Sequence, residues 1–374
     1  MNADVPKSTD VFVIGGGPAG LAAAIAARQK GFRVIVADGG QPPIDKACGE
    51  GLMPDGLAAL ERLGIQLPLT ATYAFHGIRF IGASLSTDAP FPQRGCGLAV
   101  RRILLHRLMI ERADQLGAEL RWRTAVTGIS SEGVYLGKHL VRARWVIGAD
   151  GSNSRVRRWA SLEIGPRPEL RYAFRRHYRI PPWTDHMEVY WGKVCQGYAT
   201  GVTDEQVCVA LASHDPHLRM EEGLRALPAL HARLRGAEVD SIERGALTGN
   251  RRFKRVCRRN LALIGDASGT VDAITGEGLG LAFSQAVALA ECLEAGDLEH
   301  YQIAHRRLAW RPRLMARLML ALDSRSWLQR RTLQVFQERP EIFRRLLALH
   351  IGALPPTHCV WDGLTLGWGL LTAS

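Results

Sequence analysis

The chain has 374 residues, of which 47% are apolar and 22% charged, a globular composition that excludes a disordered, collagen-like or small disulfide-stabilised protein. This length predicts two or three domains. The net charge of +12, supplied mainly by arginine, favours an anionic partner, but no motif of a common nucleic-acid-binding domain is present, so we expect no nucleic acid.

The seven cysteines and the N-terminus indicate the compartment. The cysteines show no C-x-x-C spacing, which argues against a disulfide set or a metal site. The polar residues 1–10 lack the apolar core of a secretory signal, and no stretch reaches the roughly 18 apolar residues of a membrane span. We therefore expect a cytoplasmic protein with free thiols and no metal.

The first elements predict a nucleotide-binding unit at the start of the chain. An apolar strand over 10–14, an Ala-rich helix over 21–30 and a second strand over 33–38 form a β-α-β unit. The pattern then predicts further elements in chain order: a helix over 54–63, strands within 73–98, a helix over 102–116 and strands within 120–146.

The second half alternates in the same way. We expect a mostly β region over 162–213, a helix over 218–234, a short strand over 261–264 and a helix over 279–293. The chain after 299 is predicted to be helical and rich in arginine. Because the nucleotide-binding elements recur far apart, the economical organisation is one discontinuous domain with another inserted. The predicted boundaries are 1–72, 98–160 and 250–298 for the first domain, 73–97 and 161–249 for the second, and 299–374 for a C-terminal helical region.

The glycine-rich turn after the first strand fits G-x-G-x-x-G. Gly15 suits the tight turn, Gly17 lets backbone approach a pyrophosphate, and Gly20 allows the helix to pack closely on the strand, with Ala19 between them. Asp38 ends the second strand, where a carboxylate can accept hydrogen bonds from ribose hydroxyls. This context predicts dinucleotide binding, because the helix N-terminus faces the phosphates.

Two later segments identify the family that the chain resembles. Residues 148–157, GADGSNSRVR, resemble the G-A-D-G-x-x-S-x-V-R signature of the flavin-dependent aromatic hydroxylase superfamily. Residues 265–269 and 275–280 resemble its second FAD segment. The resemblance implies an α/β fold with a Rossmann-like, glutathione-reductase-like FAD-binding domain and an inserted, mostly β substrate domain. It also implies that Asp266 meets the ribityl chain of FAD; the alternative for Asp150 and Asp266 is a helix cap.

Residues 46–54, KACGEGLMP, resemble the K-P-C-G-G-G-L-x-P loop of geranylgeranyl reductase-like flavoproteins, with departures at Ala47 and Glu50. The loop also resembles that of flavin-dependent halogenases, but the halogenase W-x-W-x-I-P tract is absent. In both relatives it lies beside the isoalloxazine, so Cys48 either touches flavin or substrate as a catalytic candidate, or only packs. The arginine that contacts the FAD phosphates in these proteins corresponds by spacing to Arg102 rather than Arg101.

Motif and resemblance together assign FAD binding to a defined set of residues. They are Gly15, Gly17, Ala19, Gly20, Asp38, Cys48, Gly49, Arg102, Asp150, Gly265, Asp266, Gly276, Gly278 and Leu279. Only one dinucleotide fingerprint is present, so NADH or NADPH is expected to act as a transient reductant.

The sequence leaves two chemistries open. The frequency of hydroxylases in the superfamily and the departures at Ala47 and Glu50 favour a monooxygenase acting on an apolar or aromatic small molecule. The Cys48 segment favours an ene reductase acting on a prenyl or polyketide lipid. A non-enzymatic prenyl-binding protein is a third candidate, but the three FAD carboxylates argue against it. Five aromatic residues are expected to form the substrate floor: Tyr172, Phe174, Tyr190, Trp191 and Tyr198.

The C-terminal region predicts an amphipathic helix. One face carries Leu308, Met315, Leu318, Met319 and Leu322, and Arg306, Arg313 and Arg317 lie opposite, with Pro312 expected to kink or start the helix. We expect the apolar face to pack in the core and the basic face to be solvated. The alternative is peripheral contact with an anionic membrane, at its inner face, or with a lipid-carrying partner.

Overall fold

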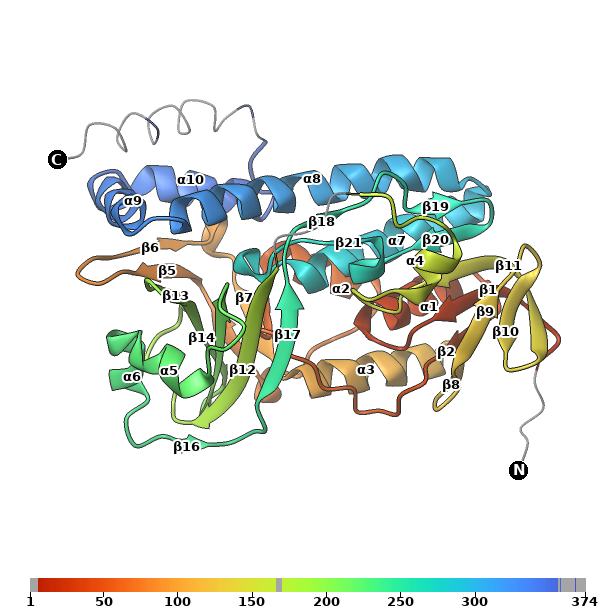
Figure 1. Cartoon of the computed structure of the whole chain (residues 1–374), viewed down its shortest axis with the longest axis horizontal. Helices are drawn as coiled ribbons and strands as arrows, with labels where there is room; N and C mark the ends of the chain where they lie inside the picture. Colours follow the sequence, from red (N-terminus) through yellow and green to blue (C-terminus); the bar gives the residue numbers. More distant parts are fainter. Residues whose placement is uncertain (1–5, 166–169, 356, 358–366, 368–374) are drawn as a thin grey trace.

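The computed structural model describes residues 6–165, 170–355, 357 and 367. A mostly parallel sheet occupies one half of the molecule, in the order β19-β20-β11-β1-β2-β8, and β10 and β9 extend it from β11 (Figure 1). Its strands are β1 (Ser8–Ile14), β2 (Val34–Ala37), β8 (Glu119–Arg121), β9 (Val126–Ile129), β10 (Gly133–Leu136), β11 (His139–Gly148), β19 (Cys257–Arg258) and β20 (Leu261–Leu263). The strands β20, β11, β1, β2 and β8 are parallel, so their carboxyl ends meet at one edge, where such sheets bind ligands.

The second large sheet is mostly antiparallel and follows the order β16-β12-β15-β14-β13-β5-β6, with β17 also paired to β12. Its strands are β5 (Gly77–Ile81), β6 (Ser86–Pro90), β12 (Arg171–Arg179), β13 (Met187–Trp191), β14 (Gln196–Thr203), β15 (Gln206–Ser213), β16 (Glu238–Val239) and β17 (Arg244–Thr248). The one parallel pair, β13 with β5, joins a segment that lies between β2 and β8 in the chain to one that follows β11. This sheet therefore combines the two stretches that were expected to form a substrate floor.

Two small sheets connect the halves. One pairs β3 (Gly51–Leu52), β7 (Gly97–Val100) and β4 (Thr72–Phe75), and the other pairs β18 (Arg251–Arg252) with β21 (Gly269–Thr270). Short 3-10 helices lie at η1 (Leu69–Ala71), η2 (Pro92–Arg94), η3 (Gly265–Ser268) and η4 (Ala273–Thr275).

The described chain up to residue 233 has six α-helices, of which the first three are close to the predicted ranges and the fourth was not predicted. They are α1 (Pro18–Gln29), α2 (Pro54–Arg62), α3 (Arg102–Gln115), α4 (Arg155–Trp159), α5 (Met220–Arg225) and α6 (Pro228–Arg233). The single helix expected over 218–234 was wrong, because it is broken into α5 and α6. Leu227 has φ −120° and ψ 75°, outside the helical region, as expected for a residue whose neighbour Pro228 disfavours that conformation.

The remaining helices are α7 (Gly278–Ala295), α8 (Leu298–Asp323), α9 (Ser326–Glu338) and α10 (Pro340–His350). Pro312 neither starts nor ends α8, which continues through it. Among the described helices, α7 alone has the length and hydropathy to cross a membrane, but it packs against α1, α2 and α8 with Phe283, Ala286 and Leu289 in the core.

A second apolar core lies where the C-terminal helices meet the second sheet. The rings of Phe80 and Trp191 lie 4.7 Å apart between centroids, and the ring of Phe343 lies 5.3 Å from Phe80. Phe336 stacks on Phe343 at 4.8 Å. Helix α8 runs along one long side of the molecule, from the central sheet to this second core (Figure 1).

The apolar face predicted for α8 is buried at Met315 and Leu322 and partly buried at Leu318 and Met319. On the opposite side, Arg306 and Arg317 are exposed as expected, but Arg313 is only partly exposed. Burial lowers the pKa of Arg313 to about 10, so this arginine does not belong to the solvated face.

Candidate functional site

The glycine-rich turn between β1 and α1 is shaped for close approach of backbone. Gly15 has φ +112°, and a Cβ on Gly20 would lie 1.8 Å from the carbonyl oxygen of Gly15, so both positions require glycine. A Cβ on Gly17 would meet no atom within 4 Å. Gly17 is also the N-cap of α1, and no side chain caps this end of the helix, so the backbone N–H groups of its first turn are left without a side-chain acceptor.

Two side chains fix this turn from neighbouring elements. Asp38, after β2, accepts hydrogen bonds from the backbone N–H of Gly16 at 2.6 Å and of Gly40 at 2.7 Å. His106 of α3 lies 2.8 Å from the carbonyl oxygen of Gly16, and because a carbonyl only accepts, His106 Nε2 carries the proton and donates it. Burial lowers the pKa of His106, which favours this neutral form.

Asp150 serves α4 with one oxygen and leaves the other unpartnered. Its Oδ2 accepts from the backbone N–H groups of Arg155 at 2.7 Å and Val156 at 3.1 Å, the capping arrangement considered from the sequence. Its Oδ1 is buried and has no hydrogen-bond partner within the described part of the chain. An acceptor in this state is suited to a ligand donor.

Asp266 on η3 lies near two cations. Its side chain is open to solvent, but its enclosed surroundings raise the pKa of the carboxyl, and Lys46 and Arg102 oppose that shift, so both charges act on this side chain. The Nε of Arg102 is buried without a hydrogen-bond partner among the described residues. The structure thus gathers a carboxylate, two cations and the open N-terminus of α1, which is the donor and acceptor set that a ribityl chain and a pyrophosphate need.

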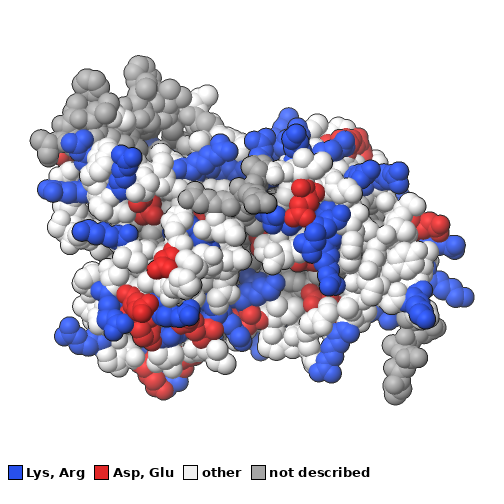
Figure 2. All heavy atoms as spheres, in the orientation of Figure 1, with Lys and Arg blue, Asp and Glu red and all other residues white. Residues whose placement is uncertain are grey.

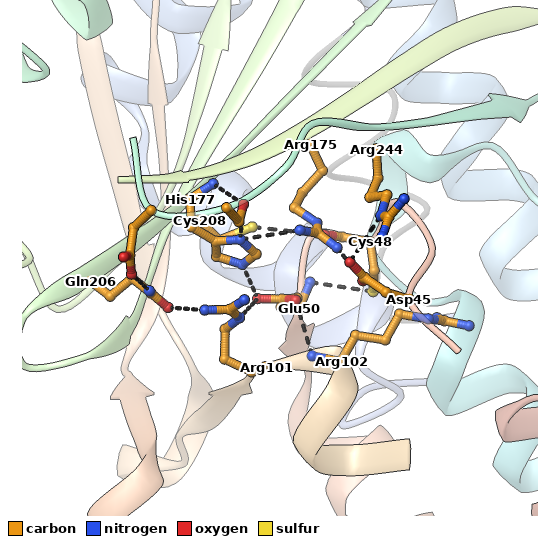
Figure 3. Close-up of polar contacts among 12 residues, drawn as sticks. Asp45, Cys48, Glu50, Arg101, Arg102, Arg175, His177, Gln206, Cys208 and Arg244 are labelled. Atoms are coloured by element: carbon orange, nitrogen blue, oxygen red, sulfur yellow. Dashed lines mark hydrogen bonds and ion pairs between the residues drawn. The ribbon is translucent and has the colours of Figure 1, made fainter. Parts of the chain in front are cut away.

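Glu50 occupies a backbone conformation that favours glycine. Its φ is +62°, which explains why the reductase-like pattern has glycine at this position. The Glu50 side chain is buried, and its carboxylate accepts from His177 Nε2 at 2.7 Å and from the backbone N–H of Arg102 at 3.0 Å. These bonds offset the backbone strain and tie the Cys48 loop to β12 and to the start of α3 (Figure 3).

The neighbours of His177 fix its tautomer. Its Nδ1 lies 2.8 Å from the hydroxyl of Ser241 and 3.1 Å from a guanidinium nitrogen of Arg175, a group that can only donate. Nδ1 therefore accepts, and Nε2–H donates to Glu50. Cys208 lies close enough to Glu50 and His177 for the three to be a candidate metal site. However, the Glu50 carboxylate already accepts the hydrogen bond from His177 and lies 3.8 Å from the cation of Arg101.

The two arginines at the start of α3 have different surroundings. Arg101 donates to Gln206 at 2.7 Å and faces Glu50, whereas the side chain of Arg102 points away from that pair (Figure 3). Cys48 accepts from the backbone N–H of Glu50 through its sulfur at 3.3 Å and is partly buried. Arg102, rather than Arg101, is therefore free of the Glu50 pair. The role of Cys48 stays a prediction.

An apolar cavity lies beside this region. Met53 contributes from the end of the Cys48 loop, Phe80 and Trp191 from the second sheet, Met315 from α8 and Phe343 from α10. The few polar groups in its wall include Thr275 and His350, and Gly276 of the second FAD-like segment also lines it. The cavity therefore extends from residues expected near the flavin into the second apolar core.

Of the five aromatic residues predicted for the substrate floor, Trp191 and Tyr198 line this cavity. Tyr190 packs on the opposite side of the sheet, where its hydroxyl donates to Glu188 at 2.5 Å. Phe174 packs against the same core as Tyr190, and Tyr172 is not part of the cavity wall. The prediction that all five aromatics line one floor was therefore wrong, because side chains of a strand alternate between the two faces of the sheet and only one face borders the cavity.

Glu277 and His350 form a buried pair at the junction of the FAD-like segment and α10. His350 Nε2 lies 3.1 Å from the carbonyl oxygen of Thr275 and must donate to it, so Nδ1 is left unprotonated, 3.4 Å from Glu277 Oε2. Burial and Asp55 raise the pKa of Glu277 well above its usual range, and burial lowers the pKa of His350 to about 4. The pair therefore holds its proton on Glu277.

Sequence reasoning did not single out Met53, Glu277 or His350 as site residues. Glu277 lies within residues 275–280, the segment that resembles the second FAD segment of the family. Its position between Gly276 and Gly278, both assigned to the cofactor, could have indicated a role in the site. His350 is separated from Glu277 by 73 positions in the numbering, and nothing in its local pattern indicates the contact.

Comparisons with known proteins agree with this geometry. A family model described as an FAD binding domain matches residues 8–177. The menaquinone reductase of Mycolicibacterium smegmatis is 29% identical over 330 residues, 79% of this chain and 78% of that protein. Digeranylgeranylglycerophospholipid reductase 1 of Methanothermobacter thermautotrophicus is 28% identical over 332 residues, 82% of this chain and 81% of that protein.

Other matches are more local or concern the fold. The rifampicin monooxygenase of Streptomyces venezuelae is 34% identical over 173 residues, 42% of this chain and 35% of that protein. A solved geranylgeranyl bacteriochlorophyll reductase-like protein from Thermoplasma acidophilum has a TM-score of 0.74 at 20% identity, covering 92% of this chain and all of that one, 100%. The chain is therefore an FAD-dependent oxidoreductase with an FAD-binding domain, similar to the menaquinone and geranylgeranyl reductases.

Proposed function

We propose that this chain reduces a carbon–carbon double bond in a polyprenyl lipid, the second of the two chemistries considered from the sequence. The apolar cavity carries this proposal, because its lining is almost wholly apolar, which suits a hydrocarbon and offers little to orient a polar aromatic ring. The curated relatives that match about four fifths of the chain are named reductases of menaquinone and of geranylgeranyl lipids, which supports the same substrate class.

The residues that would hold FAD follow from the geometry of the site. We infer that the backbone at Gly15, Gly17 and Gly20 and the side chains of Lys46 and Arg102 receive the pyrophosphate, with Asp38 at the ribose and Asp266 at the ribityl chain. Gly49 and Gly278 border open space where a flat ring could approach. When bound, FAD supplies hydride transfer, with NADH or NADPH as the transient reductant.

The domain organisation belongs to the same proposal. The central sheet takes its strands from residues 8–148 and 257–263, which supports a discontinuous, Rossmann-like FAD-binding domain of the glutathione-reductase type built from 1–72, 98–160 and 250–298. The second sheet supports an inserted substrate domain over 73–97 and 161–249, followed by the helical region from 299.

Reduction of an alkene needs a hydride at one carbon and a proton at the other. We infer that Glu277, opposite His350 Nδ1, holds that proton; it lines a small pocket that shares Met53 and Gly276 with the wall of the apolar cavity. The raised pKa of Glu277 keeps the proton available at neutral pH, and the apolar walls exclude water from the reacting carbons. Solvent then restores the proton after each turnover.

Hydroxylation is the second candidate. The match to rifampicin monooxygenase favours it, but that match covers 42% of this chain, so it supports the FAD-binding part more than the substrate cavity. The two reactions differ in their need for oxygen and in the atoms added to the product.

Oxygen dependence tests the proposal directly. The purified protein, reconstituted with FAD and reduced by NADH or NADPH under strict anoxia, is incubated with an isoprenoid quinone or a geranylgeranyl lipid in detergent. We expect a product that gains two hydrogen atoms, with no label when the reaction is repeated under ¹⁸O₂. A product that forms only in air and carries one ¹⁸O atom would establish the hydroxylase instead.

A further inference from the structure

The outward surface of α8 has a composition unlike an ordinary solvated helix face. Six exposed residues recur at intervals of three or four positions and thus share one side of the helix. This outer face of α8 consists of Ile303, Arg306, Arg307, Trp310, Leu314 and Arg317. Half of these positions are large apolar residues and half are arginines, and the two kinds are interspersed along the helix.

The apolar members are well exposed. Ile303 is 48% exposed, Trp310 43% and Leu314 45%. Their alignment on a single stripe brings them together, which differs from the isolated exposed apolar residues that any protein surface carries. A tryptophan on such a stripe is typical of side chains that sit at the boundary between lipid and water.

The basic members lack acidic neighbours on their own helix. Between Tyr301 and Leu322 the sequence of α8 contains five arginines and no aspartate or glutamate. Arg306 donates to the carbonyl of Lys254 at 3.2 Å and forms no ion pair with a described residue. Basic side chains follow the edge of the molecule that α8 forms (Figure 2). The charge of this face therefore remains available to an anionic partner.

The inner face of the same helix lines the apolar cavity. Met315, Leu318 and Met319 point to the cavity from positions adjoining Leu314 and Arg317 of the outer face. One helix thus separates the cavity from the exposed stripe, so a surface bound outside α8 would lie one helix diameter, roughly 10 Å, from the cavity.

We propose that the outer face of α8 binds the surface of an anionic lipid bilayer, with Trp310 and Leu314 inserted at the headgroup boundary and the arginines on lipid phosphates. Bulky apolar and basic residues interspersed on one helix face fit a bilayer interface. A nucleic acid would engage the arginines but would leave Ile303 and Leu314 without a partner. This inference does not rest on the proposed reaction, because docking on lipid requires neither flavin nor substrate.

Vesicle flotation tests the docking surface. Full-length protein loaded with FAD is mixed at low salt with vesicles of phosphatidylcholine alone or with phosphatidylglycerol added. We expect flotation with the anionic vesicles and little with the neutral ones, decreasing as salt rises. Replacing Arg307 and Arg317 by glutamine should weaken binding about tenfold or more, since each arginine near an anionic surface contributes roughly fivefold.

Matched variants separate this face from the general positive charge of the protein. The basic control replaces Arg225 and Arg235, exposed residues at α5 and just after α6, on the opposite side of the molecule, by glutamine. For the apolar contribution, Trp310 and Leu314 are changed to serine, and the control changes the exposed Val239 and Ile242. We expect only the α8 variants to lose flotation while retaining FAD content and circular dichroism.

Three outcomes would overturn the proposal. They are failure of the wild type to float with anionic vesicles at low salt, equal loss in both basic variants, or retention of binding by the Trp310 and Leu314 variant. Competition by a short DNA duplex that binds through the same arginines, with no effect of the apolar substitutions, would instead assign the face to a nucleic acid.

Discussion

Asp266 is the carboxylate on which the charges of Lys46 and Arg102 both act. We predict that Asp266→Ala weakens FAD affinity about ten- to a hundredfold, because a hydrogen bond from a sugar-like hydroxyl to a carboxylate contributes roughly 1.5–3 kcal/mol. Flavin absorbance after gel filtration and titration calorimetry measure the change. Asp204→Ala, at an exposed turn between β14 and β15, is the control. Tight, stoichiometric FAD in the Asp266 variant would show that this carboxylate does not bind the cofactor.

Glu277 gives a second prediction at the residue scale. If its acid form donates the proton, Glu277→Gln should lower kcat by about 10²–10⁴ while FAD content stays the same. The wild-type rate should fall as pH rises through the raised pKa of Glu277, because the carboxylate form has no proton to give, and the variant should lose this dependence. Steady-state rates from pH 6 to 10 check both points. Glu61→Gln, exposed on α2, should behave as wild type, and unchanged kcat in Glu277→Gln would remove the proposed role.

The residue scale also shows where sequence pattern stops being informative. The KACGEGLMP segment identified the loop, and the departure at Glu50 was visible in it, but the reason was not. Glu50 is tolerated at φ +62° because His177, 127 positions later, and the backbone of Arg102 receive its carboxylate. These hydrogen bonds offset the backbone strain at Glu50, but they involve residues that only the fold brings together, so the local sequence pattern cannot predict them.

At the scale of elements, the β1-turn-α1 unit allows two glycines to be compared. We predict that Gly20→Ala destabilises the protein by about 3 kcal/mol or more, because its Cβ would overlap the carbonyl oxygen of Gly15. Gly17→Ala should change stability by a few tenths of a kcal/mol but weaken FAD binding at least tenfold, because its Cβ would occupy the space open to a pyrophosphate.

Urea denaturation of the apo-proteins and FAD titration separate the two effects. Because the variants differ only in where one methyl group is added, each serves as the control for the other. Equal loss of stability in both, or full FAD affinity in Gly17→Ala, would contradict the assignment of the turn.

The same scale explains which elements could be predicted. The β1-α1-β2 unit, α3 and α7 were predicted to within a few residues, because their apolar periodicity and glycine ends are local signals. The helix over 218–234 was not, since Pro228 breaks it at Leu227. The helical character of the chain after 299 followed from its pattern, but its division into α8, α9 and α10 did not, and neither did the inward position of Arg313, which depends on packing near Gly269.

At the scale of the whole molecule, the cavity is assembled from segments far apart in the chain. Met53, Trp191 and Phe343 meet only because the Cys48 loop, the second sheet and α10 converge. The sequence indicated an apolar or aromatic substrate, but it could not show which aromatics face inward, since two sheet faces are both buried. The cofactor could therefore be predicted from the sequence, because the FAD motifs are local. The substrate class could be predicted less well, because the cavity wall is assembled by the tertiary structure.

Narrowing the cavity from α8 tests this assembly. Leu318 lines the cavity and is partly buried, so Leu318→Trp fills space at its wall without the strain of a fully buried site. The indole would displace part of a long substrate chain from the cavity. Losing the contacts of about two methylene groups costs roughly 1.5 kcal/mol of binding free energy, which corresponds to about a tenfold rise in KM. A short prenyl substrate that does not reach Leu318 should keep its KM, so we expect the ratio between long and short substrates to change.

Steady-state kinetics in detergent with a series of prenyl lengths measures that ratio, and FAD content monitors the cofactor site. The control is Leu314→Trp, the same substitution four positions earlier on the exposed side of α8, which should leave all KM values unchanged. A uniform rise in KM for every length would place Leu318 near the reacting carbons, and no change at any length would mean that the substrate does not enter this cavity. The length-dependent result follows only if the hydrocarbon extends from Gly276 towards the C-terminal helices, whose residues line the cavity together with Gly276.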